Sequence, residues 1–162
     1  MSSIIHYSHS SEMDIVLHCS DSTFGNAAMI DTWHAQRGFK NSAGIHIGYH
    51  YVILNGQLTS TKRHGAFDGS IETGRALDDD DLFEWDETAA ATLGKNNCVQ
   101  ICLIGLSGKF TSAQILALMK LLSMLRSQYH EITVTQHSDH APDTKPYCAG
   151  LTAGQIKMFN KN

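Results

Sequence analysis

Apolar residues along the chain occur in short runs and in helical periods, and these two patterns predict alternating strands and helices. The run MDIVL at 13–17 predicts a buried strand that ends at His18. Three further segments are rich in β-branched, aromatic or continuous apolar residues and are expected to be strands: 48–54, 98–105 and 131–135. A shorter strand is expected at 70–73, because the turn signals NG at 55–56 and DG at 68–69 flank the polar segment before it.

Helical periods predict two longer helices and a short one. In 26–37 the apolar residues recur at helical spacing, and Gly38 supplies the end of the helix. A capping box, TSAQ at 111–114, begins a second helix that extends to about 129. Its expected buried stripe consists of Ile115, Leu118, Met119, Leu122 and Leu125. A second capping box, TAGQ at 152–155, predicts a short terminal helix.

The order of these elements predicts a single α/β domain with a central mixed sheet and helices packed on it. The 162 residues suffice for one domain with a real core and are few for two. We expect 1–12, which is polar and rich in Ser and His, to be a loosely held lead-in, and 13–162 to form the domain. Seven acidic residues within 78–87 predict a solvated loop or a short surface helix.

Charge and cysteine content narrow the classes of function. The 12 basic and 16 acidic residues give a formal charge of -4, which offers no electrostatic case for binding nucleic acid or an anionic membrane. No apolar run approaches the length that spans a bilayer, and the N-terminus has no signal-peptide pattern, so we expect synthesis in the cytoplasm. Three of the four cysteines, Cys19, Cys98 and Cys102, lie in apolar runs and are expected to be buried free thiols.

Polar groups at the ends of the predicted strands suggest a metal site. His18 ends one apolar strand, His137 ends another, and Tyr49 lies inside a third. Side chains at strand ends converge on one edge of an open α/β sheet. Two imidazoles and the thiolate of Cys148, which follows His137 by 11 residues, would form a three-ligand zinc site with one open position.

The stretch HSDHAPDTKPYC at 137–148 also allows other chemistry. His137 and His140 could both be metal ligands if the turn is helical, although Pro142 disfavours a sustained helix. Alternatively, Cys148 could be a thiol nucleophile with one of these histidines as its base, or the stretch could be a solvated loop. The pair His46 and His50 has zincin spacing, but the expected glutamate is absent and the local pattern predicts a strand.

Seven motifs in order resemble the zinc-dependent N-acetylmuramoyl-L-alanine amidases, the group that includes phage amidase-type lysozymes and peptidoglycan recognition proteins. The resemblance covers roughly 14–150, almost the whole chain. The motifs are VLHCSDS at 16–22, IDTWHAQRGF at 30–39, IGYHYVI at 47–53, DGSIETGR at 68–75, VQICLIG at 99–105, FTSAQILALMKLL at 110–122 and QHSDHAP…K…C at 136–148.

The resemblance implies an amidase catalytic domain that cuts the amide between N-acetylmuramic acid and the L-alanine of the stem peptide. It implies that Zn2+ is held by His18, His137 and Cys148. Bound zinc lowers the pKa of its water toward about 7 and polarises the amide carbonyl. The family pattern further implies that Tyr49 hydrogen-bonds the attacking water and that Lys145 stabilises the oxyanion. His34 matches a groove or structural residue of the family and is not expected to be a ligand.

This chain departs from the family pattern at several positions. One additional residue separates Lys145 from Cys148, which bears on the role of the lysine. Ala91 stands where many relatives have a substrate-side histidine, and Cys102 stands where some have a glutamate, as in phage-type members. The segment 56–67 has the character of an insertion that shapes the groove.

The resemblance favours a phage endolysin that binds peptidoglycan as a monomer and reaches the cell wall through a separate holin. Within the enzyme class, the alternatives are a cytoplasmic amidase that recycles muropeptides and an antibacterial effector. A recognition module that binds peptidoglycan without cleaving it is the alternative outside that class. Because non-catalytic relatives tend to lose the thiolate or carboxylate ligand, the presence of Cys148 favours an enzyme.

Overall fold

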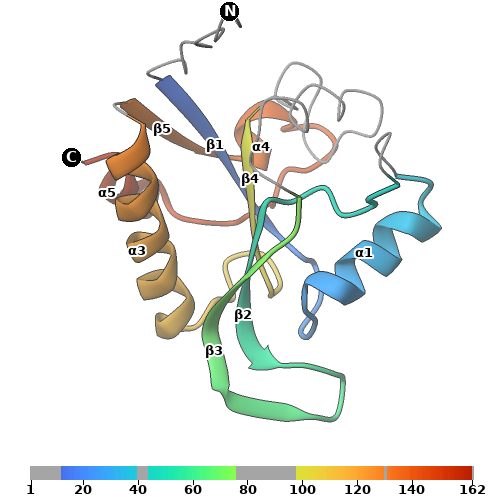
Figure 1. Ribbon diagram of the computed structural model, residues 1–162. Coiled ribbons are helices and arrows are strands. Elements are labelled where there is room, and N and C mark those ends of the chain that lie inside the picture. Colours follow the sequence, from blue (N-terminus) through green and yellow to red (C-terminus); the bar gives the residue numbers. More distant parts are fainter. Residues whose placement is uncertain (1–11, 40–43, 76–97, 130, 162) are drawn as a thin grey trace, which may run out of the picture.

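The computed structural model describes residues 12–39, 44–75, 98–129 and 131–161, and its centre is a five-stranded mixed sheet (Figure 1). The strands are β1 (Glu12–Cys19), β2 (Tyr51–Gln57), β3 (Arg63–Thr73), β4 (Val99–Leu103) and β5 (Glu131–Gln136). They lie in the order β3-β2-β4-β1-β5. Strands β2, β4, β1 and β5 are parallel, and β3 is antiparallel to β2. The acidic segment 78–87 and Ala91 lie outside the described residues.

Helices cover both faces of the sheet (Figure 1). They are α1 (Ala27–Gln36), α3 (Ser112–Gln128), α4 (His137–His140) and α5 (Ala153–Phe159). Figure 1 shows α3 on one side of the sheet and α1 on the other. Both predicted longer helices and the capped terminal helix are therefore confirmed. No helix in these described ranges is long and apolar enough to cross a membrane.

The strand alternation separates the sheet into two faces of different character. On the α3 face, Ile15 and Leu17 of β1 pack with Ile101 of β4 and with the buried leucines of α3. On the α1 face, Val52 and Leu54 of β2 pack with Ile30. The central strands also place buried polar groups, including His18 and Gln100, within the sheet. The α3 side thus supplies most of the apolar core.

The hairpin β2–β3 differs from the prediction at both of its strands. The strand expected at 48–54 begins at Tyr51, so Tyr49 lies just before β2 and not inside a strand. The strand expected at 70–73 begins at Arg63, and the segment 56–67 thus forms most of the hairpin. Gly69, predicted to be in a turn, lies within β3 at φ +83, where an added Cβ would approach the carbonyl oxygen of Ala113 to 2.8 Å. The DG signal therefore marks an irregular strand packed against α3, and not the end of a strand.

Helix α3 is rotated relative to its predicted buried stripe. Met119 was expected to be buried but is 42% exposed, while Gln114, Ala117 and Leu121 are buried. The apolar pattern includes Leu121 as well as Leu122, so it does not by itself define the centre of the stripe. Burial of Gln114 follows from its amide, whose Nε2 donates to the carbonyls of Ile53 at 2.9 Å and Ile104 at 2.8 Å.

We expect Gln114→Leu to lower the free energy of unfolding by about 1–3 kcal/mol, because two buried carbonyls lose a donor. Gln155→Leu is the matched control, since Gln155 occupies the same capping-box position in α5 without a buried bridge. It should cost less than about 1 kcal/mol. Urea denaturation of both variants measures the difference, and equal losses would contradict a structural role for the amide bridge.

Candidate metal centre

The two predicted histidine ligands lie side by side because β1 and β5 are parallel neighbours. Leu17 pairs with Gln136 in the sheet register, so His18 and His137 occupy adjacent positions at the same strand ends. Their ring centroids are 4.7 Å apart. Both side chains are buried, His18 at 1% and His137 at 8% exposure. The sheet therefore brings together two groups that are 119 positions apart, from 18 to 137.

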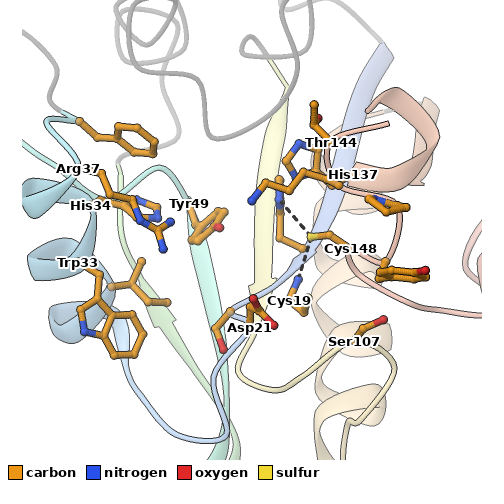
Figure 2. Close-up of a pocket in the computed structure, with 17 residues that line it drawn as sticks. Cys19, Asp21, Trp33, His34, Arg37, Tyr49, Ser107, His137, Thr144 and Cys148 are labelled. Atoms are coloured by element: carbon orange, nitrogen blue, oxygen red, sulfur yellow. Dashed lines mark hydrogen bonds between the residues drawn. The ribbon is translucent and has the colours of Figure 1, made fainter. Parts of the chain in front are cut away.

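Cys148 is brought to these histidines by a segment that is fastened at both ends. The side chain of Gln136 donates to the carbonyl of Leu151 at 3.1 Å and accepts from its N–H at 3.0 Å. The N–H of Ser138 donates to the carbonyl of Cys148 at 2.5 Å. The Cys148 Sγ lies 3.9 Å from Nδ1 of His18. Figure 2 shows Cys148 near His137.

Ligand atoms of His18, His137 and Cys148 all lie within 4.8 Å of one another. Two imidazole nitrogens and one thiolate form a donor set that zinc accepts, because zinc is borderline soft and tolerates mixed N and S ligands. The residues predicted from the sequence therefore fit a metal ion in their chemistry and in their proximity.

Burial keeps both imidazoles in the neutral form that binds metal. The pKa of His18 is lowered from 6.5 to about 3, chiefly by burial and next by the nearby His137. The pKa of His137 is lowered to about 4 by burial and then by the positive charge of Lys145. At neutral pH each ring thus carries a nitrogen lone pair, which a metal ligand requires.

The thiol of Cys148 interacts with Cys19, a residue that the sequence indicated only as a core thiol. The backbone N–H of Cys19 donates to Sγ of Cys148 at 3.4 Å. A hydrogen bond between the two thiols, followed by burial, raises the pKa of Cys148 well above its ordinary value, while the same hydrogen bond lowers the pKa of Cys19 to about 7. The two thiols of Cys19 and Cys148 thus lose their first proton readily and their second proton with difficulty. A metal that binds Cys148 must displace its proton.

Tyr49 lies over His18 although it does not belong to a strand. Its ring centroid is 4.9 Å from that of His18 and 5.2 Å from that of His34 (Figure 2). Gly74 makes this position accessible, because an added Cβ there would come within 2.2 Å of the Tyr49 carbonyl oxygen. Burial, followed by the nearby Cys102 and Cys148 thiols, raises the pKa of Tyr49 well above its ordinary value. The hydroxyl therefore keeps its proton at neutral pH.

Lys145 is exposed and lines the same cavity despite the additional residue before Cys148. The N–H of Cys148 donates to the Lys145 carbonyl at 3.2 Å, which closes a four-residue turn with Pro146 at its second position. The turn absorbs the additional residue. The charge of Lys145 lowers the pKa of both His18 and His137, so the ammonium acts on the ligands electrostatically.

The other histidines considered have different partners in the described structure. The turn after β5 is helical but short: α4 ends at His140, before Pro142, in agreement with the expectation that the proline disfavours a sustained helix. His140 Nε2 is 2.8 Å from Thr135 Oγ1 and lies outside the metal group. In the zincin-spaced pair, Nδ1 of His46 is 2.6 Å from the Phe39 carbonyl and Nδ1 of His50 accepts from the N–H of Gln100.

Gln100 contacts His18 and was not singled out by the sequence. Its Oε1 is 2.7 Å from Nε2 of His18. The available signal is a single polar residue within the continuous apolar strand VQICL, where a buried amide requires hydrogen-bond partners. The contact joins β4 to β1 across 82 positions, a separation over which sequence periodicity carries no information.

A cavity of about 340 Å3 opens over the candidate ligands. His34 lines it from α1, and its Nδ1 accepts from the N–H of Gly48 at 2.9 Å, consistent with the groove or structural role expected of it. The remaining wall includes the aromatic residues Trp33, Phe39 and Tyr147. The cavity therefore combines three metal-ligating groups with aromatic and polar walls, as a substrate site does.

The chain is similar in sequence and in fold to known proteins. No family model matches the chain. The endolysin of Klebsiella phage KP32 is 29% identical over 125 residues, which cover 72% of this chain and 66% of that protein, slightly under two thirds of its length. The N-acetylmuramoyl-L-alanine amidase LysC from Clostridium intestinale URNW superposes with a TM-score of 0.64 and 24% identity, over 92% of this chain and 85% of that one.

A selenomethionine derivative of AmpD superposes with a TM-score of 0.51 and 18% identity, over 91% of this chain and 83% of that one. The single-domain mixed α/β fold predicted from the sequence is confirmed, and this fold is shared with the amidase LysC and with AmpD.

We expect one divalent ion to bind per chain, tested with Zn2+, and its affinity to fall as pH falls, because protons compete for the ligand atoms. The pKa values of His18 and His137, about 3 and about 4, leave both imidazoles neutral near pH 5 to 6. Only the thiol proton competes there, so the affinity should fall about tenfold per pH unit and more steeply near pH 4.

Competition with a chromogenic chelator at several pH values measures this slope, with a correction for protonation of the chelator. Cys148→Ser should remove the single-proton dependence between about pH 5 and 6 because it removes the titrating thiol. A zinc content that does not change down to pH near 4 would contradict the three-residue ligand set.

Proposed function

We propose that this chain, which has the fold and the ordered motifs of the N-acetylmuramoyl-L-alanine amidases, is a zinc-dependent peptidoglycan hydrolase of the endolysin type. It cleaves the amide between N-acetylmuramic acid and L-alanine. The observation that carries the proposal is the convergence of His18, His137 and Cys148 within 4.8 Å at the floor of a cavity of about 340 Å3.

Zinc is the ion that the donor set favours, and His18, His137 and Cys148 are the residues that hold it. When bound, zinc lowers the pKa of a coordinated water and polarises an amide carbonyl. Three protein ligands are the number found in catalytic zinc sites, where the remaining position is kept for water or substrate. Both histidine side chains are buried, so bulk water is excluded from the faces of their rings that pack against the protein.

Tyr49 and Lys145, which both line the cavity, supply the remaining chemistry. The Tyr49 hydroxyl holds its proton because its pKa is raised, so it can donate a hydrogen bond and orient an attacking water above His18. Lys145 brings a positive charge whose effect reaches both histidines. A cation in this position opposes the negative charge that develops on the amide oxygen during attack.

The complete donor set favours an enzyme over a recognition module that only binds peptidoglycan, since a module of that kind has no use for a thiol ligand. The endolysin identity of the phage KP32 relative favours host lysis over muropeptide recycling or an antibacterial effector role. The proposal includes synthesis in the host cytoplasm, release to the cell wall through a separate holin, and action as a monomer.

We expect purified peptidoglycan treated with the zinc-loaded chain to yield free stem peptides that begin with L-alanine, with intact glycan strands. Mass spectrometry of the products identifies the bond that is cut. Chelation should abolish release and added zinc should restore it, and His18→Ala should abolish both release and zinc binding. Cleavage between sugars, or full activity without metal, would contradict the proposal.

We expect Tyr49→Phe to lower kcat by about 100- to 10000-fold, the range of a lost general acid–base group, while zinc content stays at one per chain. The phenylalanine ring preserves the packing against His18 and His34 and removes only the hydroxyl. Peptide release and metal analysis on the same preparation test both parts. Loss of zinc together with activity would show that Tyr49 is a structural support.

A further inference from the structure

Gln100 is a fully buried polar residue, the second residue of the central strand β4. A buried primary amide destabilises the fold unless its donors and acceptor are satisfied. Its backbone is held by His50 in both directions: the Gln100 N–H donates to His50 Nδ1 at 3.0 Å, and the His50 N–H donates to the Gln100 carbonyl at 2.9 Å. The side chain therefore leaves β4 from a fixed point.

The orientation of the Gln100 amide follows from its contact with Cys98. Its Nε2 donates to the Cys98 carbonyl at 3.2 Å. A carbonyl oxygen can only accept, so the end of the amide that faces Cys98 must be the NH2 group. The opposite orientation would set two oxygens against each other. The oxygen Oε1 must therefore be the atom that faces His18.

This orientation determines the tautomer of His18. Oε1 can only accept, and it lies 2.7 Å from Nε2 of His18, so that nitrogen must carry the proton. In the neutral imidazole the lone pair is then on Nδ1. Nδ1 is the ring nitrogen that lies 3.9 Å from the Cys148 sulfur. The lone pair of His18 is thus on the ring nitrogen that faces Cys148, one of the other candidate ligands.

We propose that Gln100 is a positioning residue that holds His18 in the Nε2–H tautomer and so presents Nδ1 to the metal. The inference rests on the zinc site of the proposed function. It adds a relay of hydrogen bonds from the Cys98 carbonyl through the Gln100 amide to the His18 imidazole. The donor and the acceptor of each of these hydrogen bonds are fixed by the chemistry of the groups. Outer partners of this kind raise the affinity of a histidine for its metal and fix the ring orientation.

The test compares three variants in the full chain. Gln100→Met keeps an unbranched side chain of similar length but removes the acceptor, and zinc affinity should fall about 10- to 100-fold. Gln100→Glu keeps an acceptor facing His18, and its protonated carboxyl can still donate to the Cys98 carbonyl, so this variant should keep most of the affinity. Gln114→Met is the control, because it removes a buried glutamine that joins α3 to the sheet away from the metal group. It should lower stability and leave zinc affinity unchanged.

The second readout does not depend on activity or on zinc. Long-range 1H–15N correlation spectra of the metal-free chain report which imidazole nitrogen of His18 carries the proton. We expect the Nε2–H tautomer in the unsubstituted chain and in Gln100→Glu, and a mixture of tautomers in Gln100→Met. An Nδ1–H tautomer in the unsubstituted chain would overturn the inference, even if Gln100→Met did not fold.

These outcomes separate the inference from the proposed function. Tight zinc binding that Gln100→Met leaves unchanged would overturn the role of Gln100 and leave the amidase proposal intact. An unsubstituted chain that keeps the Nε2–H tautomer but binds no zinc would overturn the zinc site, and with it the purpose that we assign to the relay.

Discussion

The parallel register between β1 and β5 is the constraint on which the site depends. Because Leu17 pairs with Gln136, the next residue of each strand is a histidine, and both imidazoles leave the sheet at the same level. A slip of one residue would turn His18 into the opposite face, since strand side chains alternate. Ile15 and Leu17 prevent such a slip, because they are anchored among the leucines of α3. Apolar packing on one face thus sets the metal-ligating geometry on the other.

One physical cause, burial, sets the protonation states of most groups in the site. It lowers the pKa of the imidazoles of His18 and His137, so both are neutral. It also raises the pKa of Tyr49, so the hydroxyl keeps its proton. Neutral imidazoles and a protonated Tyr49 hydroxyl can therefore be present at the same pH, as the proposed attack by water requires. Outside the ligand set, the proposed chemistry uses one charged side chain, that of the exposed Lys145.

The sequence predicted most of the fold because the central strands are nearly uninterrupted apolar runs and the helices carry capping boxes. It predicted the three candidate ligands because they follow strands or match family motifs. The predictions were wrong for the start of β2, the length of β3 and the burial of Met119. Strand irregularity and helix rotation depend on the neighbouring element, which the local sequence does not reveal. The contact of Gln100 with His18 spans 82 positions and exists only through sheet pairing, so local pattern could not reveal it.

The reciprocal hydrogen bonds between Gln136 and Leu151 close the segment that carries Cys148 into a loop with a fixed base. The sulfur of Cys148, a candidate ligand, lies near that base, whereas 142–147 are exposed at the outer part of the loop. Residues can therefore be inserted or exchanged in the outer part without displacing the thiol, as the turn that absorbs the additional residue after Lys145 illustrates. The exposed rim of the cavity and the half-buried thiol beneath it are therefore held by different parts of the loop.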